Sequence, residues 1–261
     1  MDVISSRKND NVRFIRSFLR VKHMRDEHRI FAVEGDHLCG ELAQTELNVT
    51  FAAYTEKAAE KYPNTVRLLR EKADAYIIIS DELSEYISDA KSPQGLFALA
   101  EMPCTVVPEN ACKIIVLDGV QDPGNVGTMI RTAEALGMDG AVLCNDCADL
   151  FSPKTLRASM GSILRFPCVR VQYSELRAIL KGFSVYGAML DRNALSAEEV
   201  EFPKKTAVVI GGEGGGISEE VRTLCDETVY IPIQKAESLN ASAAAAILMW
   251  QLKVKSNRKN D

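Results

Sequence analysis

From residue 113 onward, short apolar segments rich in β-branched residues alternate with segments whose apolar residues recur at helical spacing. Strands are predicted at 113–117, 141–144, 169–171, 184–188, 207–210 and 229–231. Helices are predicted at 126–136, 153–160, 175–180, 219–224 and 240–254. This alternation is typical of a parallel sheet with helices on both faces. The sequence therefore predicts an α/β fold with a mostly parallel sheet for this part of the chain.

The first hundred residues follow a different pattern, in which helix and strand segments are mixed. Residues 10–21 place Val12, Ile15, Phe18 and Leu19 at helical spacing. Short strands are predicted at 30–33, 49–54, 75–80 and 95–99, with helical stretches between them. The pattern indicates a small α/β module of three layers.

The two patterns meet in the stretch 101–108. Pro103 and Pro108 flank a run of β-branched residues there, which is typical of a linker or a connecting strand. A chain of 261 residues is long enough for one large domain or two small ones. We therefore predict two domains, residues 1–103 and residues 104–261.

The apolar runs and the cysteines of the chain indicate its cellular compartment. The chain has no run of 18 apolar residues, and the polar N-terminal segment, residues 1–8, has no apolar core, which argues against a membrane span and a secretory signal. The seven cysteines are odd in number and scattered, a pattern typical of free thiols in a reducing compartment. The chain is therefore predicted to be cytoplasmic.

Metal and histidine chemistry find little support in the sequence. Cys144 and Cys147 form a lone C-x-x-C pair without the further ligands that a structural zinc needs, so no metal is predicted. The three histidines, His23, His28 and His37, all lie near the N-terminus. This placement excludes a histidine-based catalytic site in the C-terminal half.

Charge alone leaves the partner open. The net charge of −5 argues weakly against a nucleic-acid partner. Residues 1–30, however, hold eight basic and four acidic side chains, and the last nine residues are also basic. A basic N-terminal end could contact RNA phosphates, but a solvated helix face would show the same pattern.

The first chemically distinctive segment covers residues 117–133. A buried strand ends, a tight turn follows, and a helix is predicted to start after Asn125, which is a good N-cap residue. Arg131 falls on the polar face of this helix, near the strand ends where α/β sheets place their ligands. The alternative is that Asn125 only caps the helix and Arg131 is a surface charge.

The second segment, residues 207–218, runs from a strand into a helix through five glycines that surround Glu213. Glycines let the backbone approach a ligand closely and adopt positive φ. The spacing fits neither G-x-G-x-x-G nor a P-loop. The alternative is a flexible turn.

The third segment, residues 231–250, leads from a strand through a polar loop into a helix that begins with alanines. Ser238, Asn240 and Ser242 put hydroxyl and amide groups at the helix start. An ordinary capped and buried helix would explain this pattern as well.

Together, and in this order, the three segments resemble the SpoU-type (TrmH-like) branch of the SPOUT RNA methyltransferases. The first matches its D-P-x-N-x-G-x-x-x-R-T-A motif through Asp122, Pro123, Asn125, Gly127, Arg131, Thr132 and Ala133. The second matches G-x-E-G-x-G-x-S through Gly211, Glu213, Gly214, Gly216 and Ser218. The third matches I-P-…-E-S-L-N-x-S-x-A through Ile231, Pro232, Glu237, Ser238, Leu239, Asn240, Ser242 and Ala244. The N-terminal module is similar to the L30e-like substrate-binding domain of this family, with residues 31–35 as its signature.

The resemblance implies a deep trefoil knot in the catalytic domain, S-adenosyl-L-methionine (AdoMet) as methyl donor, and a homodimer. It implies methylation of a ribose 2′-hydroxyl in RNA, with rRNA favoured over tRNA. The catalytic candidates carried over from the family are Arg131, Asn125, Glu213, Ser238 and Asn240. The cofactor-binding candidates are Gly211, Gly212, Glu213, Gly214, Ile231, Ile233, Leu239 and Ser242.

Two departures from the family pattern leave rival readings open. Many relatives have Asn where this chain has Gly212, and the loop at residues 234–236 is one residue shorter than is usual. A catalytically inactive RNA-binding protein is therefore one alternative, and an AdoMet enzyme acting on a small molecule or a base nitrogen is another. The proton acceptor also stays open between Glu213, a phosphate oxygen and a water, because the guanidinium of Arg131 has no acceptor.

Overall fold

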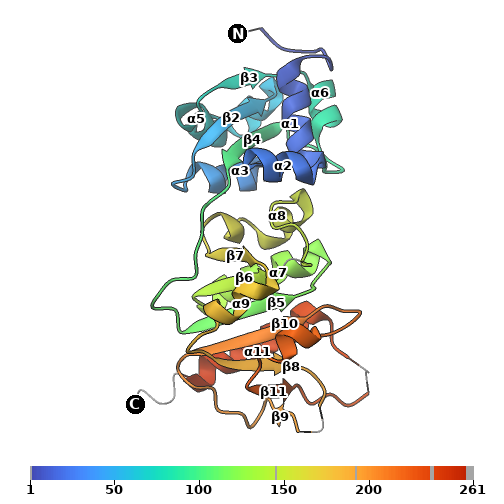
Figure 1. Ribbon diagram of the computed structural model, residues 1–261. Coiled ribbons are helices and arrows are strands. Elements are labelled where there is room, and N and C mark those ends of the chain that lie inside the picture. The colour runs from blue at the N-terminus through green and yellow to red at the C-terminus, as the bar shows by residue number, and fades with distance from the viewer. Residues whose placement is uncertain (1, 145, 192, 236–237, 257–261) are drawn as a thin grey trace. The chain divides into compact units, whose positions relative to one another are not determined.

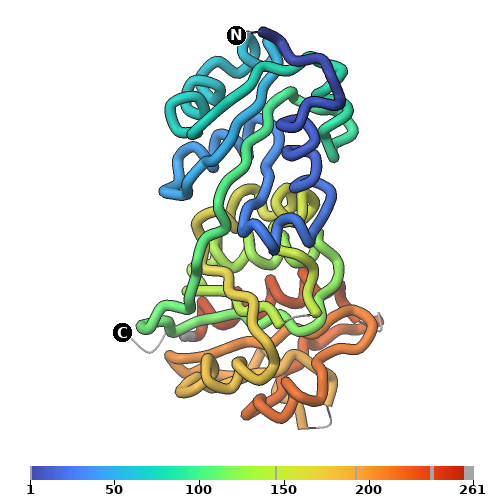
Figure 2. The backbone as a smooth tube through the Cα atoms, turned by 45° about the horizontal axis from the view of Figure 1, so that its top comes forward, coloured from blue at the N-terminus to red at the C-terminus, as the bar shows by residue number. Residues whose placement is uncertain are grey.

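The computed structural model describes residues 2–144, 146–191, 193–235 and 238–256. The chain divides into two compact units: Met1–Cys104 with Asp149–Arg165, and Thr105–Ala148 with Phe166–Asp261. Residues 102–112 contain neither helix nor strand, so this stretch is a linker and not a connecting strand (Figures 1 and 2). The predicted second domain, 104–261, includes residues 149–165, which cluster with the first unit.

The first unit is built on a four-stranded sheet with the order β1-β4-β2-β3 (Figure 1). Its strands are β1 (Ile30–Glu34), β2 (Val49–Tyr54), β3 (Tyr76–Ile78) and β4 (Leu96–Glu101). Strand β4 runs antiparallel to β1 and β2, and β2 runs parallel to β3. Its helices are α1 (Asp10–Arg20), α2 (Lys22–His28), α3 (Asp36–Ala43), α4 (Glu56–Lys61), α5 (Pro63–Lys72), α6 (Asp81–Ile87) and α8 (Pro153–Ser159). The four predicted strands and the first predicted helix are confirmed within a few residues.

Helix α1 shows how the sequence sets this unit. The side chain of Asn9 accepts hydrogen bonds from the backbone N–H groups of Asn11 and Val12, which caps the helix start. The apolar stripe of α1 is fully buried, including Ile15 and Phe18, and packs in one core with residues of β4 such as Phe97. The amphipathic pattern of residues 10–21 therefore faces the core as predicted.

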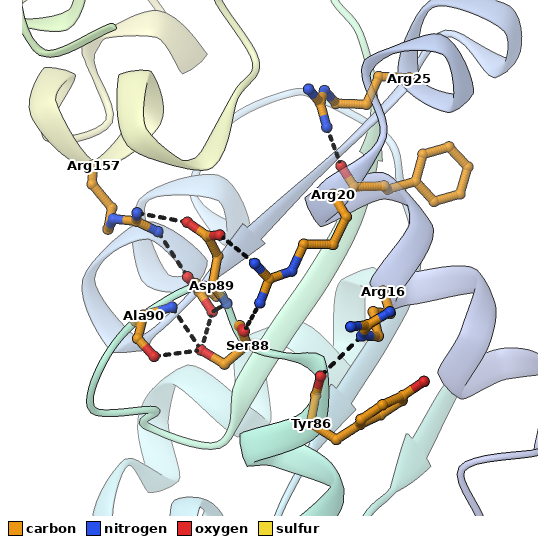
Figure 3. Close-up of polar contacts among 10 residues, drawn as sticks. Arg16, Arg20, Arg25, Tyr86, Ser88, Asp89, Ala90 and Arg157 are labelled. Atoms are coloured by element: carbon orange, nitrogen blue, oxygen red, sulfur yellow. Dashed lines mark hydrogen bonds and ion pairs between the residues drawn. The ribbon is translucent and has the colours of Figure 1, made fainter.

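Residues 149–165 join the first unit through charged groups. Arg25 donates to Asp149 Oδ2 from Nη2 at 2.6 Å and from Nε at 3.0 Å. Arg157 donates to Glu34 at 2.8 Å and to Asp89 at 2.9 Å, and Figure 3 shows Asp89 between two arginines. Two aromatic rings, those of Phe31 in β1 and Phe151, pack with centroids 4.9 Å apart. This segment is thus held by paired charges as well as apolar contacts.

The second unit contains a seven-stranded sheet with the order β7-β6-β5-β10-β8-β11-β9, and every strand pair in it is parallel. Its strands are β5 (Lys113–Asp118), β6 (Gly140–Cys144), β7 (Cys168–Val171), β8 (Ser184–Ala188), β9 (Leu195–Ser196), β10 (Thr206–Gly211) and β11 (Glu227–Tyr230). Its helices are α7 (Pro123–Leu136), α9 (Tyr173–Ile179), α10 (Glu219–Arg222) and α11 (Ala241–Ser256). The predicted parallel α/β fold is confirmed. The short strand β9 was not predicted, because two residues give no hydrophobic pattern.

Helix α7 begins three residues earlier than the sequence predicted. Pro123 occupies its first turn, and the carboxylate of Asp122 accepts a hydrogen bond from the backbone N–H of Asn125 at 2.9 Å. Proline suits the first helical position because the missing N–H would have no partner there. The prediction that Asn125 caps this helix is therefore wrong, and its side chain is left for another contact.

No helix among the described residues combines the length and apolar character needed to cross a membrane.

Candidate active site

A pocket of about 530 Å³ opens in the second unit where the carboxyl ends of three neighbouring parallel strands meet the start of α11. Residues at or just after the ends of β8, β10 and β11 line it, together with the first turns of α11. Ligands of α/β proteins bind at this edge of the sheet, and the volume lies within the usual range for small-molecule sites. The pocket is therefore the candidate cofactor site.

Most of the predicted cofactor residues line this pocket. These are Gly211, Gly212, Glu213, Ile231, Ile233 and Leu239, and they are joined by Ser238 and Asn240 from the catalytic candidates. Gly214 and Ser242 are not among the lining residues. Glu237 of the third motif lies outside the described residues.

Close backbone contacts explain the glycines that surround Glu213. A Cβ atom on Gly211 would overlap the carbonyl carbon of Gly216, and one on Gly212 would overlap the carbonyl oxygen of Gly119. The N–H of Gly216 donates to the carbonyl of Gly212 at 3.0 Å and closes the loop. Gly211 and Gly212 are therefore required because no side chain fits at either position. A merely flexible turn, the alternative considered above, would have room for one.

The three predicted motifs meet at the carboxylate of Glu213. Asn125 from the first motif and Asn240 from the third both donate side-chain hydrogen bonds to Glu213 Oε1, the second at 3.1 Å. Asn240 Nδ2 also donates to Asn125 Oδ1 at 3.2 Å. The structure therefore brings together residues that are 88 and 115 positions apart in the sequence. We call Asn125, Glu213 and Asn240 the amide–carboxylate cluster.

Ser242 supports this cluster without lining the pocket. Its hydroxyl donates to Asn240 Oδ1 at 2.6 Å and its backbone N–H donates to the same oxygen at 2.9 Å. Asn240 thereby caps α11 with its side-chain oxygen, while its amide nitrogen donates hydrogen bonds to Glu213 and Asn125. One side chain thus links the helix start to the candidate reaction centre.

Arg131 lies on the exposed face of α7, six residues beyond Asn125, while Val126, Met129 and Ile130 are buried against the core. Among the described residues, Arg131 takes part in no ion pair or hydrogen bond that would occupy its guanidinium. The predicted polar face is confirmed, but the structure does not bring Arg131 into contact with the amide–carboxylate cluster. Its five N–H donors are free to bind an incoming anion.

The charge balance of the pocket suits a cationic ligand. Glu213 is exposed and both of its hydrogen-bond partners are neutral amides, so its negative charge is not compensated by a neighbouring cation among the described residues. The remaining lining is largely apolar, with residues such as Ile231 and Leu239. AdoMet has a planar adenine ring, whose faces can pack against apolar side chains, and a positively charged sulfonium, so it fits this lining.

Met189 and Leu190 also line the pocket and were not singled out from the sequence. Both follow β8, which pairs with β10 and β11 in the sheet. Their position directly after the predicted strand 184–188 could have indicated that they line the site, because neighbouring parallel strands bring their carboxyl ends to the same edge of the sheet. Their apolar side chains, however, form no motif that stands out from a core segment.

Among the described residues, no group of three or more histidine, cysteine, aspartate or glutamate side chains is arranged to hold a metal ion.

Comparison with known proteins assigns the chain to a protein family. Residues 113–250 match the SpoU rRNA Methylase family, and residues 9–98 match the MRM3-like substrate binding domain. The chain is 34% identical over 258 residues to the 23S rRNA (guanosine(2553)-2′-O)-methyltransferase RlmP of Bacillus subtilis (strain 168), which covers 97% of this chain and 100% of that protein.

Solved structures agree with this assignment. The SpoU methyltransferase AviRb from Streptomyces viridochromogenes, in complex with the cofactor AdoMet, matches with a TM-score of 0.82 and 26% identity over 97% of this chain and 99% of that one. The AdoMet-bound rRNA methyltransferase from Sinorhizobium meliloti shares the fold, with a TM-score of 0.86 and 24% identity over 97% of each chain. The matched family region contains all three motifs and covers more than half of the sequence. This chain belongs to the SpoU rRNA methylase family.

Proposed function

We propose that this protein transfers a methyl group from AdoMet to a ribose 2′-hydroxyl of ribosomal RNA. The observation that carries the proposal is the amide–carboxylate cluster at the rim of a 530 Å³ pocket, with three sequence motifs contributing one side chain each. The Bacillus subtilis relative, which this chain matches over nearly its whole length, is named for this reaction on 23S rRNA.

AdoMet, when bound, supplies an electrophilic methyl group on a sulfonium. The backbone of Gly211 and Gly212 lines the pocket without side chains, and Ile231 and Leu239 give apolar contact area for the adenosyl part. Glu213 places a negative charge at the same pocket, where attraction to a sulfonium is stronger than in bulk water. The role of this chain is to hold the cofactor and the ribose in line, and alignment of reactants can contribute about 7 kcal/mol to a reaction.

Arg131 serves the RNA in this proposal. Its guanidinium stays protonated in proteins and cannot act as a base. It can donate two parallel hydrogen bonds to a phosphate and stabilise the negative charge that develops on the ribose oxygen. The exposed position of Arg131 on α7 leaves it accessible to a substrate as large as RNA.

The first unit supplies further cationic groups for RNA. The guanidinium carbons of Arg7 and Arg16 lie 4.8 and 4.5 Å from the centre of the Tyr86 ring. Figure 3 shows Arg16 beside Tyr86, where its Nε donates to the Tyr86 carbonyl. Arginines stacked on an aromatic ring are held in place and keep their charge available for phosphates.

A homodimer and a cytoplasmic setting complete the proposal. Trp250 and Ile247 on α11 are 53% and 37% exposed, and large exposed apolar side chains are enriched at interfaces. All seven cysteines are free, which suits a reducing compartment. A monomeric mass for the wild-type protein at micromolar concentration, measured by light scattering, would remove the dimer from this account.

The function is tested by methyl transfer from labelled AdoMet to RNA from a strain that lacks the gene. Wild-type protein and an Arg131→Ala variant are compared, and the RNA is digested to nucleosides to locate the label. Label on a ribose 2′-oxygen, reduced by about 100-fold or more in the variant, is the expected result. Binding of AdoMet and RNA without transfer would instead favour the inactive RNA-binding alternative, and label on a base would favour a different methyl acceptor.

A further inference from the structure

Asp118 is a buried carboxylate that the proposed reaction does not use. It is the last residue of β5 and only 1% of its surface is exposed. The hydroxyl of Tyr173 donates to Asp118 Oδ1 at 2.9 Å, and the backbone N–H of Ser218 donates to Oδ2 at 2.6 Å. Burial of a carboxylate is costly unless it is hydrogen-bonded, so these two contacts account for its presence in the core.

The contact with Ser218 fixes one end of the loop that carries Glu213. Ser218 is the N-cap of α10 and lies two residues after Gly216, the last glycine of the loop. At the other end of the loop, Gly211 is the register partner of Asp118 in the β5–β10 ladder. Gly212 packs against the backbone of Gly119, the residue after Asp118. The end of β5 therefore holds both ends of the loop.

Tyr173 contacts the other carboxylate oxygen of Asp118. It is the first residue of α9, and its hydroxyl also lies 3.3 Å from Asp146 Oδ2. Burial, and next the hydrogen bond to Asp118, raise the pKa of the Tyr173 hydroxyl. The hydroxyl therefore stays protonated and remains a hydrogen-bond donor at neutral pH.

We propose that Asp118, oriented by Tyr173, is a positioning residue that holds the loop of residues 211–218 and thereby places Glu213 for methyl transfer. The proposal rests on the proposed function for its catalytic consequence. Its structural part, the tethering of the loop, can be tested without any substrate.

The two contacts distinguish a hydrogen-bonding role from a role of the charge itself. An asparagine at position 118 would accept from Ser218 through its oxygen and donate to Tyr173 through its amide, while the tyrosine hydrogen turns to Asp146. An alanine could make neither contact. Asp118→Asn should therefore preserve the loop, and Asp118→Ala should release it.

Hydrogen–deuterium exchange on the full-length protein without cofactor tests the tether directly. We expect the peptide covering residues 211–218 to exchange about 10-fold faster in Asp118→Ala and at the wild-type rate in Asp118→Asn. Unchanged exchange in the β4 peptide, residues 96–101, controls for the fold of the first unit. Should Asp118→Ala fail to fold, Tyr173→Phe, which keeps the Ser218 contact, is expected to give a smaller increase confined to the same peptide.

Turnover gives the second readout. With saturating AdoMet and RNA, kcat should fall by about 100-fold in Asp118→Ala, as expected for a displaced catalytic group, and stay within about 3-fold of wild type in Asp118→Asn. Wild-type exchange and kcat in Asp118→Ala, or equal losses in the two variants, would overturn the proposal. If the wild-type protein methylates no RNA, the proposed function fails, and the exchange data still decide whether Asp118 holds the loop.

Discussion

The two units each hold a polar cluster, and the clusters are built in opposite ways. In the charged cluster of the first unit, each of the charges meets an opposite charge: Arg157 pairs with Asp89 at 2.9 Å (Figure 3) and with Glu34 at 2.8 Å, and Arg25 pairs with Asp149 at 2.6 Å. The side chains of Arg25, Asp149 and Glu34 are at most 14% exposed. The charges of this cluster are paired with one another, so none of them is left to bind a ligand.

In the second unit, Glu213 is exposed and is held only by the neutral amides of Asn125 and Asn240 among the described residues. The amides fix the position of the carboxylate without cancelling its charge. Placement without neutralisation is what a site for a cationic ligand requires, whereas paired and buried charges serve the fold. The comparison therefore separates the scaffold of this molecule from its candidate reaction centre.

The largest predicted effect concerns stability in the first unit. Asp149→Ala leaves the buried guanidinium of Arg25 without its carboxylate, and loss of one partner of a buried pair costs about 3 to 5 kcal/mol. Urea unfolding should show a correspondingly lower midpoint. Asp10→Ala is the matched control, because its 4.0 Å pair with Arg13 is exposed and should contribute less than about 0.5 kcal/mol. Equal effects of the two substitutions would contradict the scaffold role.

Glu213→Gln should affect catalysis and leave stability unchanged. The substitution keeps the shape of the side chain and removes its charge, so kcat should fall by about 100-fold while the thermal midpoint stays within about 2 °C of wild type. Glu219→Gln, at an exposed glutamate six residues further along, is the control and should behave like wild type. A stability loss in Glu213→Gln without a loss of activity would place Glu213 in the scaffold.

A smaller effect is expected when one amide is removed. Asn125→Ala deletes a donor to Glu213 and leaves the donor from Asn240, so kcat/KM should fall by about 10-fold. Because Asp122 caps α7, the helix should remain intact, and circular dichroism should be unchanged. Loss of helix signal in this variant would mean that Asn125 acts as a cap after all.

The smallest effect is a pH dependence in the core of the second unit. Burial raises the pKa of Cys144 from 9.0 to about 12. Below pH 9.0 the thiol is protonated in both states, and above it the unfolded state loses its proton first, so stability falls as pH rises toward 12. The free energy of unfolding, measured at about pH 8 and about pH 10.5, should fall less between these values in Cys144→Ala than in wild type. The same decrease in both proteins would contradict this assignment.

Much of this architecture could be predicted from the sequence. Local hydrophobic patterns predict most strands of both sheets. The motifs around Asn125, Glu213 and Asn240 follow strands whose carboxyl ends lie at one edge of the sheet. That these three side chains meet, however, depended on the family resemblance. The trefoil knot rests on the resemblance alone, and it stays a prediction.

Other features had no local signal. Arg25 and Asp149 lie 124 residues apart, and no pattern in either segment predicts the ion pair that connects residues 149–165 with the first unit. The start of α7 was misplaced because Asp122 and Asn125 are both good capping residues, and Pro123 between them decided in favour of the first. The limits of the two domains also stay a prediction, which limited proteolysis would test.

The central claim is that the carboxylate of Glu213 carries an uncompensated charge directed at the sulfonium of AdoMet. The most direct test is calorimetric binding of AdoMet and of S-adenosylhomocysteine, its uncharged thioether counterpart, to wild-type protein and to Glu213→Gln. The account predicts that the substitution weakens AdoMet binding about 10-fold more than it weakens binding of the neutral ligand. Equal weakening of both ligands would contradict it and leave Glu213 with a role in shaping the pocket only.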